Sequence, residues 1–226
     1  MKLLAIETAT EACSAALSVN GEISQKYEVA PRRHTELILP MVQGLLADAD
    51  LSLQQLDAIT FGRGPGAFTG VRLATAVVQG MALGADLPVV PISTLACLAQ
   101  GAYRATGQGN WLAAIDARMS EVYWANYRID AGVACLLGEE RVCAPNRVQQ
   151  VVEASWQAVG SGWVSFGEIL SEHLNIDISL CELVPFPQAQ DLIPLALAAK
   201  TRNGWVPVEQ ALPLYLRDKV AKKKSS

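Results

Sequence analysis

The 226-residue chain lacks the uninterrupted apolar run of about 18 residues that a membrane-spanning helix needs, and its first apolar run already ends at Glu7, too early for a signal peptide. Its five cysteines are odd in number, scattered and never spaced as Cys-x-x-Cys, which disfavours a disulfide framework or a zinc site. Charged residues make up 18% of the chain and hydrophobic ones 51%, so the composition excludes disorder and supplies a sizeable core. We expect a cytoplasmic protein of one large or two small domains, without membrane contact.

The chain is also poor in recognisable catalytic motifs. Its only histidines are His34 and His173, and it contains no His-Glu-x-x-His pair, no Gly-x-Ser-x-Gly motif and no Walker loop. We interpret His34 as a surface or interface residue and His173 as exposed. We interpret Ser161, which lies between two glycines, as part of a flexible loop. The sequence therefore predicts no catalytic residue and no metal site.

The charge is distributed unevenly along the chain. The formal net charge is −4, but the last ten residues hold five of the 18 basic residues and one of the 22 acidic ones, which leaves −8 on residues 1–216. An acidic body disfavours direct binding of tRNA or DNA, because neutralisation of phosphates supplies most of such affinity. The basic tail from about residue 217 is either a solubilising end or a contact with nucleic acid.

Apolar periodicity predicts an alternating order of strands and helices over the first 106 residues. Strands are expected over residues 2–7, 13–19, 23–29, 56–61 and 88–92, and helices over 35–49, 69–85 and about 94–104. Asn20-Gly21 supplies a hairpin turn, Thr69 is a plausible cap of the second helix, and Ser93 or Thr94 caps the third. Pro40 either kinks the first helix or marks its true start.

The second half of the chain repeats the first. Leu112–Asp116 is an apolar run that ends on an acid, as Leu3–Glu7 is, and a turn and two strands follow each run at nearly the same offset. We predict two domains, residues 1–106 and 107–226, of which the second is a degraded copy with helices over 145–155 and 191–202. A chance resemblance between two simple β-meanders is the alternative.

Two features of the first repeat invite a ligand-binding interpretation. A strand that ends on Glu7 and continues into Thr8 and Thr10 could orient a metal-bound phosphate, but Glu11 would repel phosphate, and a local capping role is equally well supported. A glycine-rich loop offers free amides at a helix N-terminus, yet a tight turn that brings this helix against the sheet is the favoured interpretation. ATP or ADP binding by this chain alone is therefore not expected. The loop residues concerned are Gly64, Pro65, Gly66, Phe68, Thr69 and Gly70.

The first two predicted helices carry more apolar surface than one sheet can cover. In the second helix, Arg72, Thr75 and Gln79 form one narrow polar stripe, and nearly all other residues are apolar or tiny. In the first, Leu37 and Leu39 point away from the main apolar face. This surplus predicts a protein–protein interface, with complete burial by the second half of the chain as the rival. The candidate interface residues are His34, Leu37, Met41, Arg72, Thr75, Ala76, Gln79 and Leu83.

Three segments together resemble the bacterial TsaB (YeaZ) family: Leu3–Thr10, Pro91–Leu95, and the run Gly64-Pro65-Gly66-Ala67-Phe68-Thr69-Gly70-Val71-Arg72. The resemblance covers the first half of the chain in order and the second half more loosely, and the glycine-rich run is specific to the family. The resemblance implies an α/β fold of duplicated ribonuclease H-like lobes from the actin/Hsp70/sugar-kinase superfamily, with a degraded second lobe. The family also carries a glycoprotease designation inherited from its paralogue TsaD.

The resemblance further implies a non-catalytic dimerisation or scaffold subunit. Such a subunit binds and stabilises TsaD, which transfers a threonylcarbamoyl group to the adenosine beside the anticodon of tRNA. TsaB proteins pair through their first two helices, so a heterodimer with TsaD and a homodimer of the chain alone are both expected, with TsaE joining through the complex and tRNA contacted only indirectly. TsaD holds its metal with a His-x-x-x-His pair, and the matching segment Pro91–Leu98 has no histidine. A small-molecule kinase of the same superfamily or a glycoprotease-like peptidase is the alternative.

Overall fold

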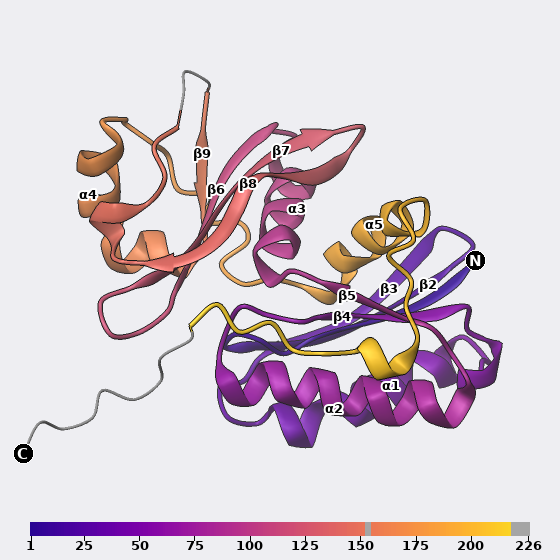
Figure 1. Ribbon diagram of the computed structural model, residues 1–226. Helices are drawn as coiled ribbons and strands as arrows, with labels where there is room; N and C mark the ends of the chain where they lie inside the picture. The colour runs from indigo at the N-terminus through magenta and orange to yellow at the C-terminus, as the bar shows by residue number, and fades with distance from the viewer. Residues whose placement is uncertain (152–154, 218–226) are drawn as a thin grey trace, which may run out of the picture.

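The first of two mixed sheets occupies the amino-terminal part of the chain. A computed structural model describes residues 1–151 and 155–217 (Figure 1). The sheet has the order β3-β2-β1-β4-β5 and contains β1 (Lys2–Glu7), β2 (Ala12–Val19), β3 (Glu22–Val29), β4 (Ala58–Gly62) and β5 (Val89–Ile92). β1, β4 and β5 run parallel, whereas β1–β2–β3 is an antiparallel meander. Asn20 and Gly21 have φ angles of 53° and 95°, as a tight hairpin turn requires, which confirms the predicted turn.

The second sheet repeats this connectivity in reduced form. Its order is β8-β7-β6-β9, with β6 (Asn110–Asp116), β7 (Val122–Asp130), β8 (Val133–Cys143) and β9 (Gln157–Val159). A single bridge between Ala158 and Leu180 stands where the first sheet has β5. The match between the strand orders β3-β2-β1-β4 and β8-β7-β6-β9 confirms the predicted α/β fold of two duplicated lobes with a degraded second copy.

The predicted helix over residues 145–155 is wrong where the structure describes it. Pro145–Arg147 forms only a 3-10 turn, and the chain continues in an extended conformation at Val148. Val148 is buried in the apolar cluster beside the second sheet, so packing on the sheet outweighs the local helical pattern. Residues 152–154 lie outside the described part of the chain.

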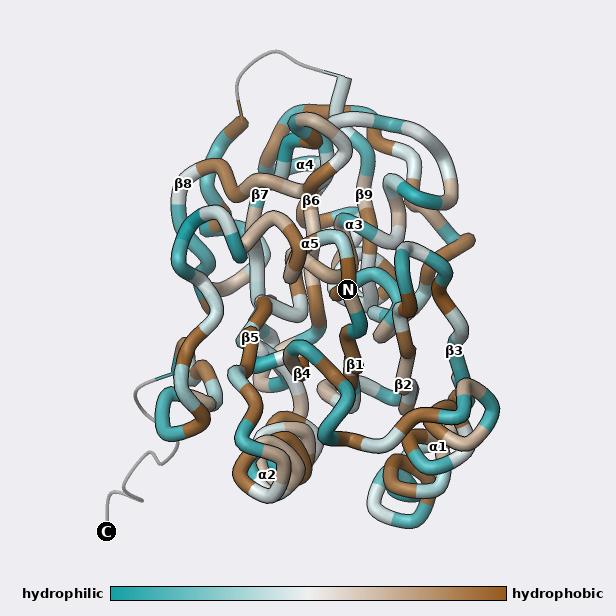
Figure 2. The backbone as a smooth tube through the Cα atoms, turned by 90° about the vertical axis from the view of Figure 1, so that its right-hand side faces the viewer, coloured by the Kyte–Doolittle hydropathy of each residue, from teal (hydrophilic) through white to brown (hydrophobic). Residues whose placement is uncertain are grey.

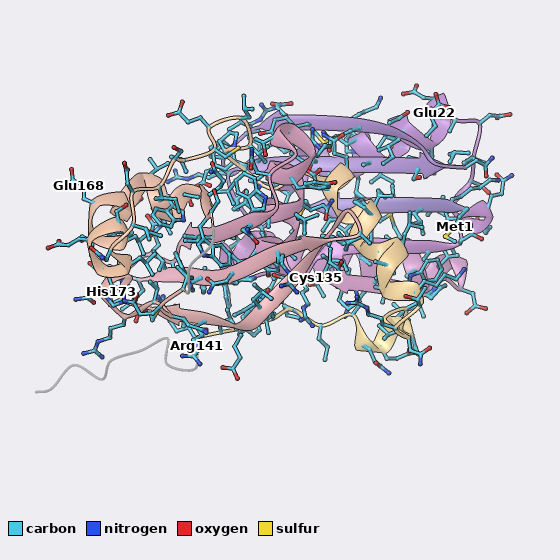
Figure 3. The ribbon with its side chains drawn as sticks, turned by 90° about the horizontal axis from the view of Figure 1, so that it is seen from above. Met1, Glu22, Cys135, Arg141, Glu168 and His173 are labelled. Carbon is cyan, nitrogen blue, oxygen red and sulfur yellow. The ribbon has the colours of Figure 1, made fainter. Side chains whose placement is uncertain are left out.

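Five α-helices of the described residues lie in layers around the two sheets. α1 (His34–Asp48) and α2 (Phe68–Ala85) lie side by side on the outer face of the first sheet (Figure 2). α3 (Thr94–Thr106) packs on the second sheet and α5 (Ala189–Lys200) on the first, and the two helices contact each other between the sheets (Figure 1). α4 (Ser161–Leu174) covers the far face of the second sheet; Figure 3 shows its Glu168 and His173 at the end of the molecule opposite Met1 and Glu22.

The central strands are buried on both faces. In β1, Leu4 and Ile6 belong to the apolar cluster with α1 and α2, whereas Leu3 and Ala5 belong to the cluster with α5. β6 follows the same rule, since alternate residues pack toward α3 and toward α4. Burial on both faces explains why these strands are nearly continuous apolar runs.

The chain returns to the first sheet after residue 188. α5 packs on β1, β2, β4 and β5, and Val206 pairs with Val89 at the edge of β5. α5 and the segment after it therefore lie on the first lobe. The division of the chain into domains of residues 1–106 and 107–226 stays a prediction.

Three local predictions at helix ends have different outcomes. Ser93 caps α3, as predicted, because its hydroxyl accepts hydrogen bonds from the backbone N–H groups of Leu95 and Ala96, the second and third residues of the helix. Thr69 is not a cap, because α2 begins one residue earlier and has Ala67 at its N-cap position. α1 begins at His34, and Pro40 lies inside it.

One ion pair joins the two helices between the sheets. Asp191 on α5 is only 1% exposed, and its carboxylate accepts hydrogen bonds from Arg104 Nε at 2.6 Å and Nη2 at 3.2 Å. Burial raises the pKa of Asp191 above its ordinary value, and Arg104 partly offsets this rise. Gly101 leaves room for the carboxylate, since a Cβ at this position would lie 2.6 Å from Asp191 Oδ2.

Substitution Arg104→Met should destabilise the fold, because it leaves the Asp191 carboxylate buried without a cation. Removing one partner of a buried pair costs about 3–5 kcal/mol, and the partial exposure of Arg104 reduces the expected loss to about 2–4 kcal/mol. Urea unfolding at pH 7.5 measures this loss, and the double variant Arg104→Met/Asp191→Asn should recover at least half of it. A single variant as stable as the wild type would contradict the assignment.

Candidate functional site

The outer face of α2 is apolar and uncovered. Its opposite face packs on the first sheet through residues such as Ala74, Val78 and Ala82. The outward residues Ala76, Gly80, Leu83 and Gly84 are exposed; Leu83 is 72% exposed, and a Cβ built at either glycine meets no atom within 4 Å. Small outward residues allow another helix to approach closely. We call these four residues the α2 docking face.

α1 contributes less surface than the sequence suggested. Met41 is 8% exposed within the first-sheet core, and Leu37 is half-buried against that core. Leu39, which was not among the candidate interface residues, is 46% exposed. His34 is also half-buried, with its Nε2 bonded to the carbonyls of Thr10 (2.9 Å) and Ala12 (3.2 Å). His34 therefore ties α1 to the β1–β2 turn, and Met41 does not reach the surface.

The predicted polar stripe of α2 is occupied within the same chain. Thr75 is buried, and its hydroxyl donates to the carbonyl of Val71. Gln79 Nε2 donates to the carbonyl of Ala211 (2.8 Å), and Arg72 Nε donates to the Tyr215 hydroxyl (2.8 Å). The segment 206–217, which we call the C-terminal strap, runs along α2 in Figure 1. The strap covers one flank of α2 and leaves the α2 docking face open.

The glycine-rich loop brings the start of α2 against the end of β1. A Cβ at Gly66 would overlap the carbonyl of Ala9, and one at Gly70 would overlap the carbonyl of Thr8. The N–H of Ala67 donates to the Ala9 carbonyl at 2.7 Å. Close approach thus explains these two glycines, as the favoured interpretation of the loop required. Gly64 and Pro65 are buried in the same loop, whereas Phe68 and Thr69 are exposed at its end.

The predicted nucleotide candidates lie mostly inside the fold. Glu7 and Thr8 are 0% exposed; the Glu7 carboxylate accepts a hydrogen bond from the N–H of Ala9 at 2.6 Å, and the Thr8 hydroxyl donates to the Gly70 carbonyl at 2.7 Å. Thr10 alone lines a pocket, and its Oγ1 has no hydrogen-bond partner among the described residues. The Glu7 and Thr8 side chains are therefore engaged in hydrogen bonds inside the fold.

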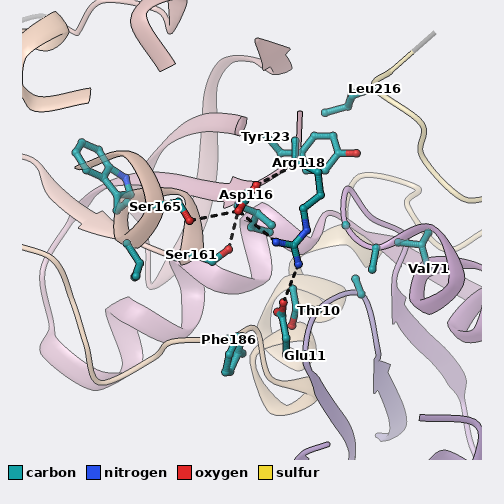
Figure 4. A pocket seen from close by; sticks show the side chains of 18 of the residues that line it. Thr10, Glu11, Val71, Asp116, Arg118, Tyr123, Ser161, Ser165, Phe186 and Leu216 are labelled. Atoms are coloured by element: carbon teal, nitrogen blue, oxygen red, sulfur yellow. Dashed lines mark hydrogen bonds and ion pairs between the residues drawn. The ribbon is translucent and has the colours of Figure 1, made fainter. Parts of the chain in front are cut away.

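A cavity of about 1320 Å³ opens between the lobes, where β1 and β6 end (Figure 4). Asp116 Oδ1 accepts a hydrogen bond from the N–H of Arg118 (2.7 Å), and Oδ2 accepts one from Ser165 Oγ (3.3 Å). The Arg118 guanidinium also contacts Asp116 and reaches across to Glu11 Oε1 at 3.6 Å, which joins the lobes. Arg118 therefore balances the charge of Asp116, and Ser165 adds a hydrogen bond to the same carboxylate.

The other walls of this pocket are apolar and aromatic. They include Val71, Trp163, Phe186 and Tyr215. Such a pocket suits a group with both apolar and polar parts.

Sequence reasoning missed helix α4 and the place of Ser161 in it. Ser161 is the first residue of α4, and its hydroxyl accepts a hydrogen bond from the N–H of Asp116 at 3.1 Å. The expectation of a flexible loop is therefore wrong. The repeat contained the signal, because a glycine loop leads from β9 into α4 as another leads from β4 into α2. His173 is half-buried and bonds to the carbonyl of Val148, so its predicted exposure is only partial.

Within residues 1–151 and 155–217, no three His, Cys, Asp or Glu side chains are grouped so that they could hold a metal ion. No helix in this described part is both long and apolar enough to span a membrane.

Comparisons with known proteins identify the family of the chain. The family model described as "TsaD: tRNA N6-adenosine threonylcarbamoyltransferase" matches residues 20–224. Proteins described as tRNA threonylcarbamoyladenosine biosynthesis protein TsaB, from Escherichia coli (strain K12) and Haemophilus influenzae, are 44% and 41% identical to it; both matches cover 99% of this chain, and 98% and 97% of the relatives. The solved structure of YeaZ from Pseudomonas aeruginosa has a TM-score of 0.89 and 47% identity, over 95% of this chain and 99% of that one. The chain belongs to the TsaB (YeaZ) family.

The buried Glu7 predicts an unusual dependence of stability on pH. Burial raises the pKa of Glu7 from 4.5 to about 7, and the hydrogen bond from Ala9 only partly lowers it. A carboxyl group whose pKa is higher in the folded than in the unfolded state favours folding when protonated. Its contribution is therefore complete below pH 4.5 and is lost as the pH rises to about 7.

Substitution Glu7→Gln removes this titration and keeps an oxygen for the bond from Ala9. The variant should exceed the wild type in unfolding free energy by about 2–3 kcal/mol at pH 8, with no such gain near pH 4.5. Urea unfolding across this range measures the difference. The exposed substitution Glu22→Gln is the control and should follow the wild type. Parallel pH profiles of Glu7→Gln and the wild type would contradict the assignment.

Proposed function

We propose that this chain is a non-catalytic subunit that docks its α1–α2 surface on TsaD, in the biosynthesis of threonylcarbamoyladenosine beside the anticodon of tRNA. The relatives that match it over nearly their full length are described as proteins of tRNA threonylcarbamoyladenosine biosynthesis. On this proposal, the complex transfers the threonylcarbamoyl group, and this chain stabilises the partner that carries the chemistry.

The α2 docking face is the observation that supports the proposal most strongly. Ala76, Gly80, Leu83 and Gly84 form an outward face without a charged side chain, and neither the second lobe nor the C-terminal strap covers it. The rival interpretation, complete burial by the second half of the chain, does not apply to these residues. An uncovered apolar helix face is typical of a protein contact surface.

The family match supports a partner of the same architecture. The model described as TsaD extends over nearly the whole chain, so we infer that TsaD can present an equivalent pair of helices. Two such pairs can meet about a local two-fold axis, and the same geometry lets two copies of this chain form a homodimer. On this proposal the α2 docking face serves TsaD when it is present and a second copy when it is absent.

Other components would meet the complex rather than this chain alone. The acidic body, with a net charge of −8 over residues 1–216, suits indirect contact with tRNA. We include TsaE as a partner of the complex and place the protein in the cytoplasm, where tRNA is modified. A nucleotide held by Glu7 and Thr8 is not part of the proposal, because both side chains are bonded inside the fold.

Substitution Gly80→Glu places a charge at the centre of the α2 docking face. A glutamate there would be desolvated without a partner, so the dissociation constant for TsaD should rise at least about 30-fold, equivalent to about 2 kcal/mol. Ala76→Glu should act in the same direction. Because glutamate favours a helix more than glycine does, loss of binding at residue 80 would not reflect unfolding. Calorimetric titration with TsaD measures the change.

The matched control is Gly167→Glu. Gly167 lies in α4, and a Cβ there also meets no atom within 4 Å. This variant should bind TsaD as the wild type does and should restore modified tRNA in a mixture with TsaD. Unchanged binding by both Gly80→Glu and Ala76→Glu would place the TsaD contact elsewhere and overturn the proposal.

A further inference from the structure

The C-terminal strap connects α2 to both lobes. Along α2 it accepts hydrogen bonds from Gln79 at Ala211 and from Arg72 at Tyr215. Toward the first lobe, the N–H of Leu214 donates to the carbonyl of Arg63 at 2.8 Å. The strap then leaves α2 and reaches the second lobe.

Arg217 makes the connection to the second lobe. Its side chain is only 20% exposed, and its Nη2 donates to the carbonyl of Ala117 at 3.1 Å and forms an ion pair with Glu121. Its Nη1 also approaches Met119 Sδ at 3.6 Å. All three partners lie in or next to the turn between β6 and β7, so one side chain fixes the end of the strap to this turn.

The turn that receives Arg217 has a costly backbone conformation. Three successive non-glycine residues, Arg118, Met119 and Ser120, have φ angles of 61°, 56° and 58°. Left-handed conformations are unfavourable for non-glycine residues. The N–H of Ala117 donates to the carbonyl of Glu121 at 2.9 Å across the turn, and Arg217 binds both of these residues. The Arg217 contacts therefore hold together a turn that is otherwise unfavourable.

Close to Arg217, the strap also contacts side chains at the start of α2, beside the α2 docking face. The Arg72 guanidinium lies 3.7 Å from the centroid of the Phe68 ring, and its Nε donates to the Tyr215 hydroxyl. The rings of Phe68 and Tyr215 are 6.0 Å apart. Phe68 is 54% and Tyr215 47% exposed. The positions of Phe68 and Arg72 at the start of α2 thus depend on Tyr215, two residues before Arg217.

We infer that Arg217 is a positioning residue for partner binding: it anchors the strap on the second lobe, and the strap holds Arg72 and Phe68 in the geometry that the partner meets. The partner surface thereby extends from the α2 docking face onto Tyr215. The inference rests on the proposed function, since the partner is TsaD.

Four variants test the anchor through binding of TsaD to the full chain. Arg217→Ala and Glu121→Gln both break the ion pair and should each raise the dissociation constant about tenfold. Arg217→Lys keeps a cation for Glu121 and should stay within about threefold of the wild type. The exchange variant Arg217→Glu/Glu121→Arg should recover most of the affinity that Arg217→Ala loses.

Arg141→Ala is the matched control, because Arg141 pairs with Glu139 on β8 and has no hydrogen bond or ion pair with the described residues of the strap. It should bind as the wild type does. Hydrogen exchange supplies a second measurement: in Arg217→Ala, amides of residues 117–121 and 208–216 should exchange faster, while those of α4 should not change.

The outcomes distinguish the inference from the proposed function. If the wild type does not bind TsaD, the proposed function fails. If the wild type binds and both Arg217→Ala and Glu121→Gln bind equally well, with faster exchange in the strap, the anchor is only structural and the inference is overturned. Should Arg217→Ala fail to fold, Glu121→Gln, which retains Arg217 and its bond to Ala117, decides between these outcomes.

Discussion

The packing of α2 is the constraint on which the rest of the structure depends. This helix is apolar or small almost all round, so it needs cover on several sides. The first sheet covers one side, and the C-terminal strap covers another through Gln79 and Arg72. The glycine-rich loop allows this arrangement, because Gly66 and Gly70 bring the start of α2 against the end of β1. One face of α2, with Ala76 and Gly80, is left open, and a partner can bind there.

The protein has two lobes because its fold is duplicated, although the proposed contact with a partner uses only the first lobe. β1 runs parallel to β4, and β6 runs parallel to β9. The ends of β1 and β6 lie at the pocket that forms between the lobes. In the first lobe, the acid at this strand end is Glu7, which the fold buries. In the second, it is Asp116, which pairs with Arg118 and accepts a hydrogen bond from Ser165. Both carboxylates thus make contacts within the protein. The lobes are joined by α3, α5 and the strap.

Much of the fold could be predicted from the sequence, and the failures have physical reasons. The strands of the first lobe, β6–β8 of the second lobe, the Asn20-Gly21 turn and the Ser93 cap follow from local patterns, because turn chemistry and capping act over a few residues. The short strand β9 was not predicted. The helix expected after residue 145 fails because Val148 packs on the sheet, and α4 was missed because its glycine-flanked start looked like a loop. At the candidate site, Ala76 and Leu83 are exposed, as the predicted interface requires, and the interface itself stays a prediction. The burial of Met41 and Thr75 and the bonds of Arg72 and Gln79 to the strap were not predicted, because they depend on contacts between segments far apart in the chain.

The central claim is that the outer surface of α1 and α2 binds the partner. Hydrogen exchange of the full chain, alone and with an excess of TsaD, tests it most directly, provided that a dilute chain keeps its own dimerisation low. The account predicts slower exchange in peptides from residues 34–48 and 68–85 and in the strap, with α4 unchanged. Protection confined to α4 or to the second sheet, with α1 and α2 unaffected, would contradict it.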